Sequence, residues 1–421
     1  MIIAVTPNPA LDLTWHVPSL TVGSTHRADA GAARAGGKGV NVARVAHTQG
    51  TDAVAVTTCG GATGEEFAAD LEASGVPHVL VPVAAATRRS LALVDESLGD
   101  TTVVNEFGVA PTAAEWIALT DAVAAALAGA SREKPHSAGE TTSARVSHAE
   151  SDFSGGEGRA DAGAADVLVI SGSFPPGTPG DVLPALIRLG RDAGATVIVD
   201  TSGPSLLVAA DAGASVLKPN EHELRDATGL DDPIDGAREL LRRGAELVLL
   251  SLGADGMLAV SAAPTSARPG ASRRYEMGAG TPDAGRVPAS GPTSGVSAPE
   301  ADAAAPAAAG LSILHARLDT PLTGNPTGAG DAAVAACAVL MDAGIHDPEQ
   351  ILRRATAWSA AAVLMPLAGE IHASWPDLER ALTVASRPEN ALPARELLSG
   401  AHSHATTEFS PTRPTDPKDS R

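Results

Sequence analysis

The stretch TGNPTGAGDAAVAACAVLMDAG, residues 323–344, decides how the rest of the chain is interpreted. A Gly-rich turn, Gly328-Ala329-Gly330, runs directly into Asp331 and then into a long, Ala-rich apolar segment that predicts a helix. Short residues at such a turn leave backbone N–H groups free at a helix N-terminus, where the helix dipole favours an anion. Asp331 is therefore either a helix cap or a base that takes a proton from the acceptor of a transferred phosphoryl group.

Composition sets the class of protein. The chain has 421 residues, enough for one large α/β domain or two smaller ones. Hydrophobic residues make up 44% and aromatic residues only 2%, so the core must consist of Ala, Val and Leu. The net charge of −20 argues against a nucleic-acid partner or an anionic membrane surface, because both need a basic face.

The ends and the cysteines indicate the compartment. The first residues, MIIAVTPNPALD, lack the basic and apolar regions of a signal peptide. The chain has no run of 18 uncharged apolar residues, so we expect no membrane span. Cys59 and Cys337 are far apart and give neither a disulfide framework nor a metal-binding spacing. These features predict a protein of the reducing cytoplasm.

Short β-branched runs alternate with Ala/Leu-rich runs, which predicts a mainly parallel sheet flanked by helices. The expected strands are residues 2–6, 53–58, 78–83, 167–171, 196–200, 215–218, 246–252 and 256–261. The expected helices are residues 38–49, 64–74, 112–129, 179–193, 233–243, 328–343, 348–364 and 376–386. Residues 90–95 and 101–106 predict a hairpin that belongs to a small lid, formed by about 12–34 and 88–106.

Three stretches are rich in Ser, Gly, Pro, Ala or charge: about 131–163, about 263–310 and 387–421. Such segments cannot bury enough apolar surface to offset their chain entropy. We expect two flexible insertions and a disordered tail, which leaves residues 1–386 as one domain.

The first candidate site lies after the first strand. TPNPALD places Asn8 and Asp12 beyond its carboxyl end, where α/β sheets bind ligands. Asp12 either accepts hydrogen bonds from a polyol or forms an ordinary turn. Arg27, Arg88 and Arg89 flank the expected lid and are either solvated surface or cations that grip a substrate phosphate.

A Gly-rich helix start, AGGKGVNVARVAHTQG at residues 35–50, provides a second candidate. Gly36, Gly37 and Gly39 allow close backbone approach, and Lys38 supplies a mobile cation suited to a phosphate. Asn41 offers a donor and an acceptor for hydroxyl groups. The segment predicts a sugar or anion site.

Three further segments end strands on the same edge of the sheet. VLVISGSFPPG (167–177) brings the hydroxyl of Ser173 and free N–H groups there. In VLKPNEHEL (216–224), Asn220 and Glu223 follow Lys218 and share one helix face, which suits Mg²⁺ held largely through water. Glu223 could equally be a charge that stabilises the helix N-terminus. SLGADG (251–256) is a turn suited to nucleotide phosphates.

Together these motifs resemble the PfkB (ribokinase-like) carbohydrate kinases. TPNPALD, AGGKGVNVA, SGSFPPG, KPNEHEL, SLGADG and NPTGAGD occur in the family's order and span most of residues 1–386. The opening motif, the lid hairpin and KPNEHEL are most similar to the branch of 1-phosphofructokinases and tagatose-6-phosphate kinases. NPTGAGDA departs from the usual TVGAGDS, and AAAVLMPLAGE (360–370) lacks the customary small-residue pattern beside adenine.

The resemblance implies a ribokinase-like three-layer α/β/α sandwich with a small β-sheet lid, and a role for each motif residue. Asp331 would be the catalytic base, with Gly328, Ala329 and Gly330 as its anion hole. The implied sugar-phosphate contacts are Asp12, Gly36, Gly37, Lys38, Asn41, Arg88, Arg27 and Ser173. The implied ATP contacts are Lys218, Asn220, Ser251, Gly253, Asp255 and Gly256, with Glu223 and Asn220 at Mg²⁺.

The implied reaction is transfer from MgATP to the C6 hydroxyl of fructose 1-phosphate. Within the same branch, tagatose 6-phosphate or fructose 6-phosphate could instead be the acceptor, phosphorylated at C1. A more distant alternative is a non-catalytic sugar-phosphate-binding protein. The resemblance also implies a homodimer that forms through the lid.

Overall fold

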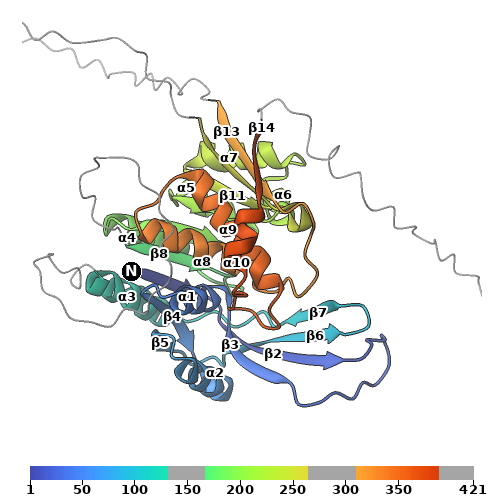
Figure 1. Ribbon diagram of the computed structural model, residues 1–421. Helices are drawn as coiled ribbons and strands as arrows, with labels where there is room; N and C mark the ends of the chain where they lie inside the picture. The colour runs from blue at the N-terminus through green and yellow to red at the C-terminus, as the bar shows by residue number, and fades with distance from the viewer. Residues whose placement is uncertain (131–165, 264–309, 388–421) are drawn as a thin grey trace, which may run out of the picture.

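The computed structural model describes residues 1–130, 166–263 and 310–387 (Figure 1). It shows a ten-stranded sheet between two layers of helices, and a separate four-stranded sheet that projects from one side. The predicted α/β/α sandwich with a small β-sheet lid is confirmed. The expected insertions and tail fall almost entirely outside the described residues, although Arg387 is the last residue of a strand.

The main sheet is parallel over seven of its strands, and the other three are antiparallel. Its spatial order is β14-β13-β12-β11-β10-β9-β8-β1-β4-β5. The strands are β1 (Ile2–Thr6), β4 (Ala53–Cys59), β5 (His78–Pro82), β8 (Val167–Ser171), β9 (Thr196–Asp200), β10 (Val216–Leu217), β11 (Leu247–Ser251), β12 (Met257–Ala262), β13 (Leu311–Arg317) and β14 (Thr383–Arg387).

Helices cover both faces of this sheet because its strands are apolar on both sides. In β1, Ile2 and Ala4 face one hydrophobic core and Ile3 and Val5 face the other. On the first face lie α1 (Lys38–Thr48), α2 (Gly61–Ser74), α8 (Ala329–Asp342), α9 (Pro348–Val363) and α10 (Trp375–Ala381). On the second lie α3 (Ala113–Ala130), α4 (Val182–Asp192), α5 (Pro204–Asp211), α6 (Glu221–Thr228) and α7 (Pro233–Arg243).

Helix α3 is the one segment among the described residues whose length and composition would suit a membrane span. Its apolar face is used inside the domain, because Trp116, Leu119, Val123 and Leu127 are buried in the second core. With 28% of its residues buried, α3 is a surface helix that packs one face on the second core.

The lid is the sheet β3-β2-β6-β7. Its strands are β2 (Ala10–Val17), β3 (Ala32–Gly36), β6 (Arg88–Asp95) and β7 (Asp100–Asn105). The β6–β7 pair is the predicted hairpin, and β2 lies parallel to β6 and antiparallel to β3. Asp95 fixes the lid loops, because its carboxylate accepts hydrogen bonds from the backbone N–H groups of Leu20, Ser97 and Leu98.

One predicted helix, residues 376–386, is wrong in its second half. Helix α10 ends at Ala381, and β14 pairs with β13 from Thr383 to Arg387. Thr383 and Val384 are β-branched and favour a strand. Pairing with β13, which is distant in sequence, decides the outcome.

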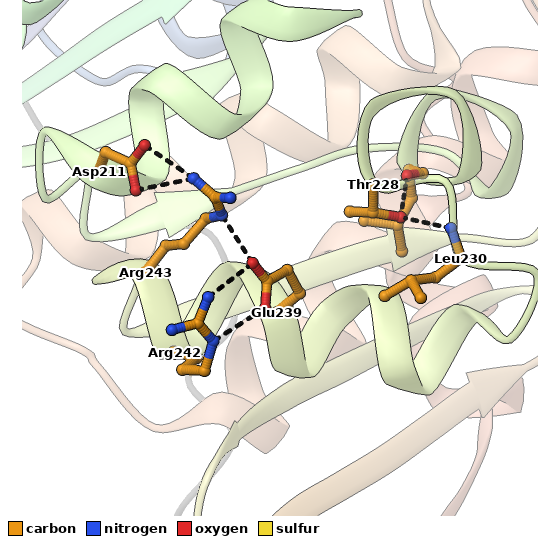
Figure 2. A network of polar contacts seen from close by, with 7 residues as sticks. Asp211, Thr228, Leu230, Glu239, Arg242 and Arg243 are labelled. Carbon is orange, nitrogen blue, oxygen red and sulfur yellow. Dashed lines mark hydrogen bonds and ion pairs between the residues drawn. The ribbon is translucent and has the colours of Figure 1, made fainter. Parts of the chain in front are cut away.

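An ion-pair network joins α5 to α7 (Figure 2), and these helices lie at the end of the domain away from the lid strands (Figure 1). Arg243 Nη1 donates to both carboxylate oxygens of Asp211 at 3.1 and 2.9 Å, and its Nε donates to Glu239 at 2.8 Å. Arg242 donates to both oxygens of Glu239 at 2.9 Å, and these hydrogen bonds lower the pKa of Glu239 to about 2. Because the network lies at the surface, we expect it to contribute little to stability.

Candidate active site

The seven parallel strands of the main sheet end at one edge, and a cleft of about 940 Å³ lies there under the lid. Strand β1 leads to Asn8, β8 to Ser173, β10 to Lys218, and β11 ends in Ser251. This is the position at which α/β sheets bind ligands. The predicted residues that line the cleft are Asp12, Gly37, Lys38, Asn41, Arg88, Ser173, Lys218, Asn220, Glu223, Ser251, Gly253, Gly256, Gly328, Ala329, Gly330 and Asp331.

Asp331 lies in the first turn of α8 and is 6% exposed. Gly328 caps the helix with φ 85°, a left-handed conformation that favours glycine. The side chain of Asn41 on α1 donates a hydrogen bond to Asp331 Oδ2 at 2.8 Å. Burial raises the pKa of Asp331 to about 7, and Asp200 adds to the rise, whereas Lys38 and the bond from Asn41 oppose it. The site thus holds a carboxyl group poised to exchange a proton near neutral pH.

Activity should therefore depend on pH through Asp331. A carboxyl group that accepts a proton must be ionised, and with a pKa of about 7 it is mostly protonated at pH 6. We expect kcat/KM to rise about tenfold per pH unit below pH 7 and to level off above it, since kcat/KM reports the free enzyme. Initial rates between pH 5.5 and 9 measure the profile. A profile that is flat from pH 5.5 to 8 would contradict this role.

Two lysines meet at a buried carboxylate beside the turn at residues 328–330. Asp200 is fully buried at the end of β9, and its Oδ1 lies 3.3 Å from Lys38 Nζ and 3.5 Å from Lys218 Nζ. The hydroxyl of Ser171 donates to Oδ2 at 3.3 Å. Burial acts to raise the pKa of Asp200, but Lys218 and Lys38 together lower it. Asp200 therefore stays ionised and holds two cations next to the turn at residues 328–330.

Lys38 also faces Glu223, whose Oε1 lies 3.6 Å from Nζ. Burial acts to lower the pKa of Lys38, but Asp200, Glu223 and Asp331 raise it above its ordinary value. The ammonium group is thus charged when a substrate enters. Lys218 lies directly against the turn at residues 328–330, because a Cβ added to Gly330 would be 3.3 Å from Lys218 Nζ.

The lid provides the other wall of the cleft. Asp12 on β2 packs against Gly36 so closely that an added Cβ there would lie 1.9 Å from Oδ2. Burial raises the pKa of Asp12 to about 6, although Arg88 and a hydrogen bond from Ser90 lower it. Gly36 itself does not line the cleft and serves to make room for Asp12.

Asn8 joins the lid to the main sheet. Its Nδ2 donates to the carbonyl of Phe107 at 3.0 Å and to the hydroxyl of Ser173 at 3.3 Å. Arg88 donates from Nε and Nη2 to the carbonyl of Asn8 at 3.3 and 3.2 Å. The guanidinium is therefore held at the entrance to the cleft, where an anionic group could be bound.

On the opposite wall, Asn220 and Glu223 form a capping box at the start of α6. Asn220 Oδ1 accepts from the N–H of Glu223 at 2.8 Å, and Glu223 Oε2 accepts from the N–H of Asn220 at 2.9 Å. The alternative role of Glu223, stabilising the N-terminus of α6, is thus seen in the structure, with Asn220 as the N-cap. It leaves Glu223 Oε1 directed toward Lys38 in the cleft.

Three predicted site residues lie outside the cleft wall: Gly36, already described, Arg27 and Asp255. Arg27 is exposed in the loop between β2 and β3, and Asp255 lies in the turn before β12 with its carbonyl 2.7 Å from His315 Nε2. Asp200 was not predicted as a site residue. Its position at the carboxyl end of the parallel strand TVIVD was the available signal, the same one that identified Asp12 and Lys218.

Comparisons with known proteins show which proteins the chain resembles. The model of the pfkB family of carbohydrate kinases matches residues 8–150 and 135–274. An ATP-dependent 6-phosphofructokinase isozyme 2 of Mycobacterium tuberculosis is 34% identical over 265 residues, which are 61% of this chain and 67% of that protein. A 1-phosphofructokinase of Haloferax volcanii is 33% identical over 267 residues, or 62% and 73%.

Solved structures show the same ribokinase-like fold. Phosphofructokinase-2 from Escherichia coli in complex with fructose-6-phosphate superposes with a TM-score of 0.63 at 24% identity, covering 90% of this chain and 98% of that chain. An Arabidopsis thaliana ribokinase complexed with ribose and ATP gives 0.55 at 17% identity, covering 90% and 98%. The match to the family model ends at residue 274 and does not include Asp331.

Proposed function

The chain belongs to the pfkB family of carbohydrate kinases, and we propose that it transfers the γ-phosphoryl group of MgATP to the C6 hydroxyl of fructose 1-phosphate. One observation carries the proposal. Asp331, a buried carboxyl group with a pKa of about 7, stands at an anion-binding helix start between a lid with Arg88 and a wall with Lys218 and Ser251. That arrangement suits an acceptor on one side of the base and a nucleotide on the other.

Asp331 would take the proton of the acceptor hydroxyl as that oxygen attacks the γ-phosphorus. Asn41 occupies Oδ2, which leaves Oδ1 to accept the proton. The backbone N–H groups of residues 328–330 and the ammonium of Lys218 would offset charge on the phosphoryl group. Closure of the lid would exclude water and so limit hydrolysis of ATP. Most of the catalysis is positioning and electrostatics.

The residues present fit a magnesium ion carried in by the nucleotide. Among the described residues there is no cluster of three or more His, Cys, Asp or Glu side chains that could hold a metal alone. Mg²⁺ suits such a site, because it keeps several waters and binds mainly through phosphates and one or two carboxylates. Glu223, which lines the cleft with Oε1 3.6 Å from Lys38 Nζ, would supply the carboxylate. When bound, Mg²⁺ would neutralise charge on the β- and γ-phosphates.

Fructose 1-phosphate is the preferred acceptor because relatives named 1-phosphofructokinase, from organisms as distant as Haloferax volcanii and Bacillus subtilis, are 28–33% identical to the chain. The opening motif, the lid hairpin and KPNEHEL also resemble that branch. The relative named 6-phosphofructokinase isozyme 2 supports fructose 6-phosphate as the second candidate, with tagatose 6-phosphate in the same class. Coupled assays with all three phosphates test the choice. We expect the highest kcat/KM with fructose 1-phosphate. ATP turnover that none of them stimulates would refute the kinase proposal and favour a sugar-phosphate-binding protein.

Arg88 should govern binding of the sugar phosphate. Loss of a charged hydrogen-bonding partner costs about 1.5–3 kcal/mol, so Arg88→Met should raise the KM for the sugar phosphate roughly 10- to 100-fold. The KM for ATP should stay within about twofold of its original value. Arg89→Met is the matched control, because Arg89 is the next residue of β6, is exposed and does not line the cleft. Equal effects of the two variants would contradict the role of Arg88.

A homodimer that forms through the lid remains a proposal. The lid region exposes apolar side chains, including Val104 at 57% and Leu98 at 77%. Exposed apolar side chains that lie together are typical of a protein–protein interface. Sedimentation equilibrium of the purified chain would give its mass.

A further inference from the structure

We propose that Arg34 and Glu370 form a latch that couples the lid to residues 324–330, the turn that leads into α8. We call this turn the catalytic turn, and Arg34 is then a positioning residue for phosphoryl transfer. The inference rests on the proposed kinase function and adds a physical link between the lid and the catalytic turn. The link runs from lid strand β3, through residues 364–370, to the turn that precedes α8. We call residues 364–370 the brace loop.

The first contact joins the lid to the brace loop. Arg34 Nη2 donates to Glu370 Oε1 at 2.6 Å, and its Nη1 donates to the carbonyl of Ala368 at 3.0 Å. The side chain of Arg34 is 19% exposed, and such a forked, partly buried contact is geometrically specific. Arg34 lies opposite Asp12 in the β2–β3 pairing. Movement of the strand that carries Asp12 is thus transmitted to the brace loop.

The second contact joins the brace loop to the catalytic turn. A Cβ added to Gly328 would lie 2.8 Å from Ala368 Cα in the brace loop. One added to Gly324 would lie 2.1 Å from the carbonyl oxygen of Val363, the last residue of α9, directly before that loop. Asn325 Nδ2 donates to the carbonyl of Pro366 at 3.0 Å, and its backbone N–H donates to Val363 at 2.8 Å. The turn therefore rests directly on the brace loop.

The brace loop also touches the residue that orients the base. A Cβ added to Gly369 would lie 3.1 Å from Asn41 Oδ1 and 3.2 Å from Arg44 Cδ. Asn41 is the donor to Asp331, so displacement of Gly369 would disturb that hydrogen bond. Arg44 is 3% exposed and bound to Asp70, and Asp70 also accepts from the N–H of Ala35 on β3. The loop is thus held against α1 and β3 together.

This link accounts for a departure in the sequence. AAAVLMPLAGE differs from the family's usual pattern beside adenine, and it contains the whole brace loop. Here Ala368 and Gly369 provide the close backbone approach and Glu370 provides the acceptor for Arg34. The segment combines packing at the catalytic turn with a contact to the lid.

Three variants test the latch, so that the test does not depend on a single variant that folds poorly. Arg34→Ala removes both hydrogen bonds, and Glu370→Gln keeps the shape but removes the charge. We expect kcat to fall about tenfold in Arg34→Ala, equivalent to 1.4 kcal/mol, with both KM values within about threefold. The ratio of ADP to phosphorylated sugar should rise, because a lid that is not coupled to the catalytic turn excludes water less well and more ATP is hydrolysed. Glu370→Gln should show the same changes in smaller degree, and Arg34→Lys should restore part of kcat.

Amide hydrogen exchange tests the coupling without turnover. In Arg34→Ala, residues 367–370 should exchange faster than in the original chain. Arg353→Ala is the control, because it breaks a comparable 3.0 Å ion pair, with Glu349, inside α9. Unchanged exchange at residues 367–370, or a kcat no lower than that of Arg353→Ala, would overturn the latch. Absence of turnover in the original chain would instead refute the kinase function, and exchange would still decide the latch.

Discussion

Asp331→Asn should reduce kcat by about 10²- to 10⁴-fold, the usual contribution of a positioned general base. The amide keeps the shape of the carboxyl group and can still lie beside Asn41, but it cannot accept the hydroxyl proton. Because burial already disfavours the charged form of Asp331, removing the charge should cost little stability. Steady-state assays with saturating ATP and sugar phosphate measure the loss.

Two controls separate chemistry from binding. ATP affinity, measured by calorimetry, should stay within about threefold, because Lys218 and Ser251 are unchanged. The residual activity should also lose the pH step near 7. Turnover within about fivefold of the original enzyme would contradict the assignment of Asp331 as base.

Asp200→Asn should cause the largest loss of stability. Asp200 is fully buried and compensates Lys38 and Lys218, and the side chain of Lys218 is only 4% exposed. Removing one partner of a buried charge cluster leaves an uncompensated charge and typically costs about 3–5 kcal/mol. We expect this decrease in the free energy of unfolding, measured by urea denaturation at pH 7.

A second substitution identifies the cause. Asp200→Asn combined with Lys218→Met removes the stranded charge, so the double variant should be more stable than Asp200→Asn alone. Asp211→Asn is the matched control: Asp211 also faces an arginine, but its side chain is 55% exposed (Figure 2). That control should lose less than about 1 kcal/mol. Equal losses for Asp200→Asn and Asp211→Asn would show that the buried cluster does not stabilise the fold.

Local patterns predict most of the sheet and miss the strands that depend on distant partners. Apolar β-branched runs such as VLVIS and TVIVD are strands in the structure because they are buried on both faces. Strand β3, with the sequence AARAG, has little intrinsic β preference and forms through its pairing with β2. Strand β14 likewise depends on β13. Pairing of this kind has no local signature.

The site residues likewise separate into those that a local pattern predicts and those that depend on a distant partner. Lys218, Ser251 and Asp331 could be predicted because each lies at or directly after the end of a strand or begins a helix at one edge of the sheet. Asp12 could be predicted because it closely follows β1, although it lies inside lid strand β2. Arg34 could not, since its partner Glu370 is 336 residues away and neither residue carries a motif. Arg27 shows the reverse error, because a charge near a lid in sequence need not face the cleft.

Phosphorus NMR of the reaction products tests the central claim most directly. The purified chain is incubated with fructose 1-phosphate and MgATP, and new phosphomonoester signals are followed together with ADP. We predict one new phosphomonoester on C6, formed in equal amount to ADP and absent with Asp331→Asn. ADP that accumulates with inorganic phosphate and no second phosphomonoester would contradict phosphoryl transfer to the sugar.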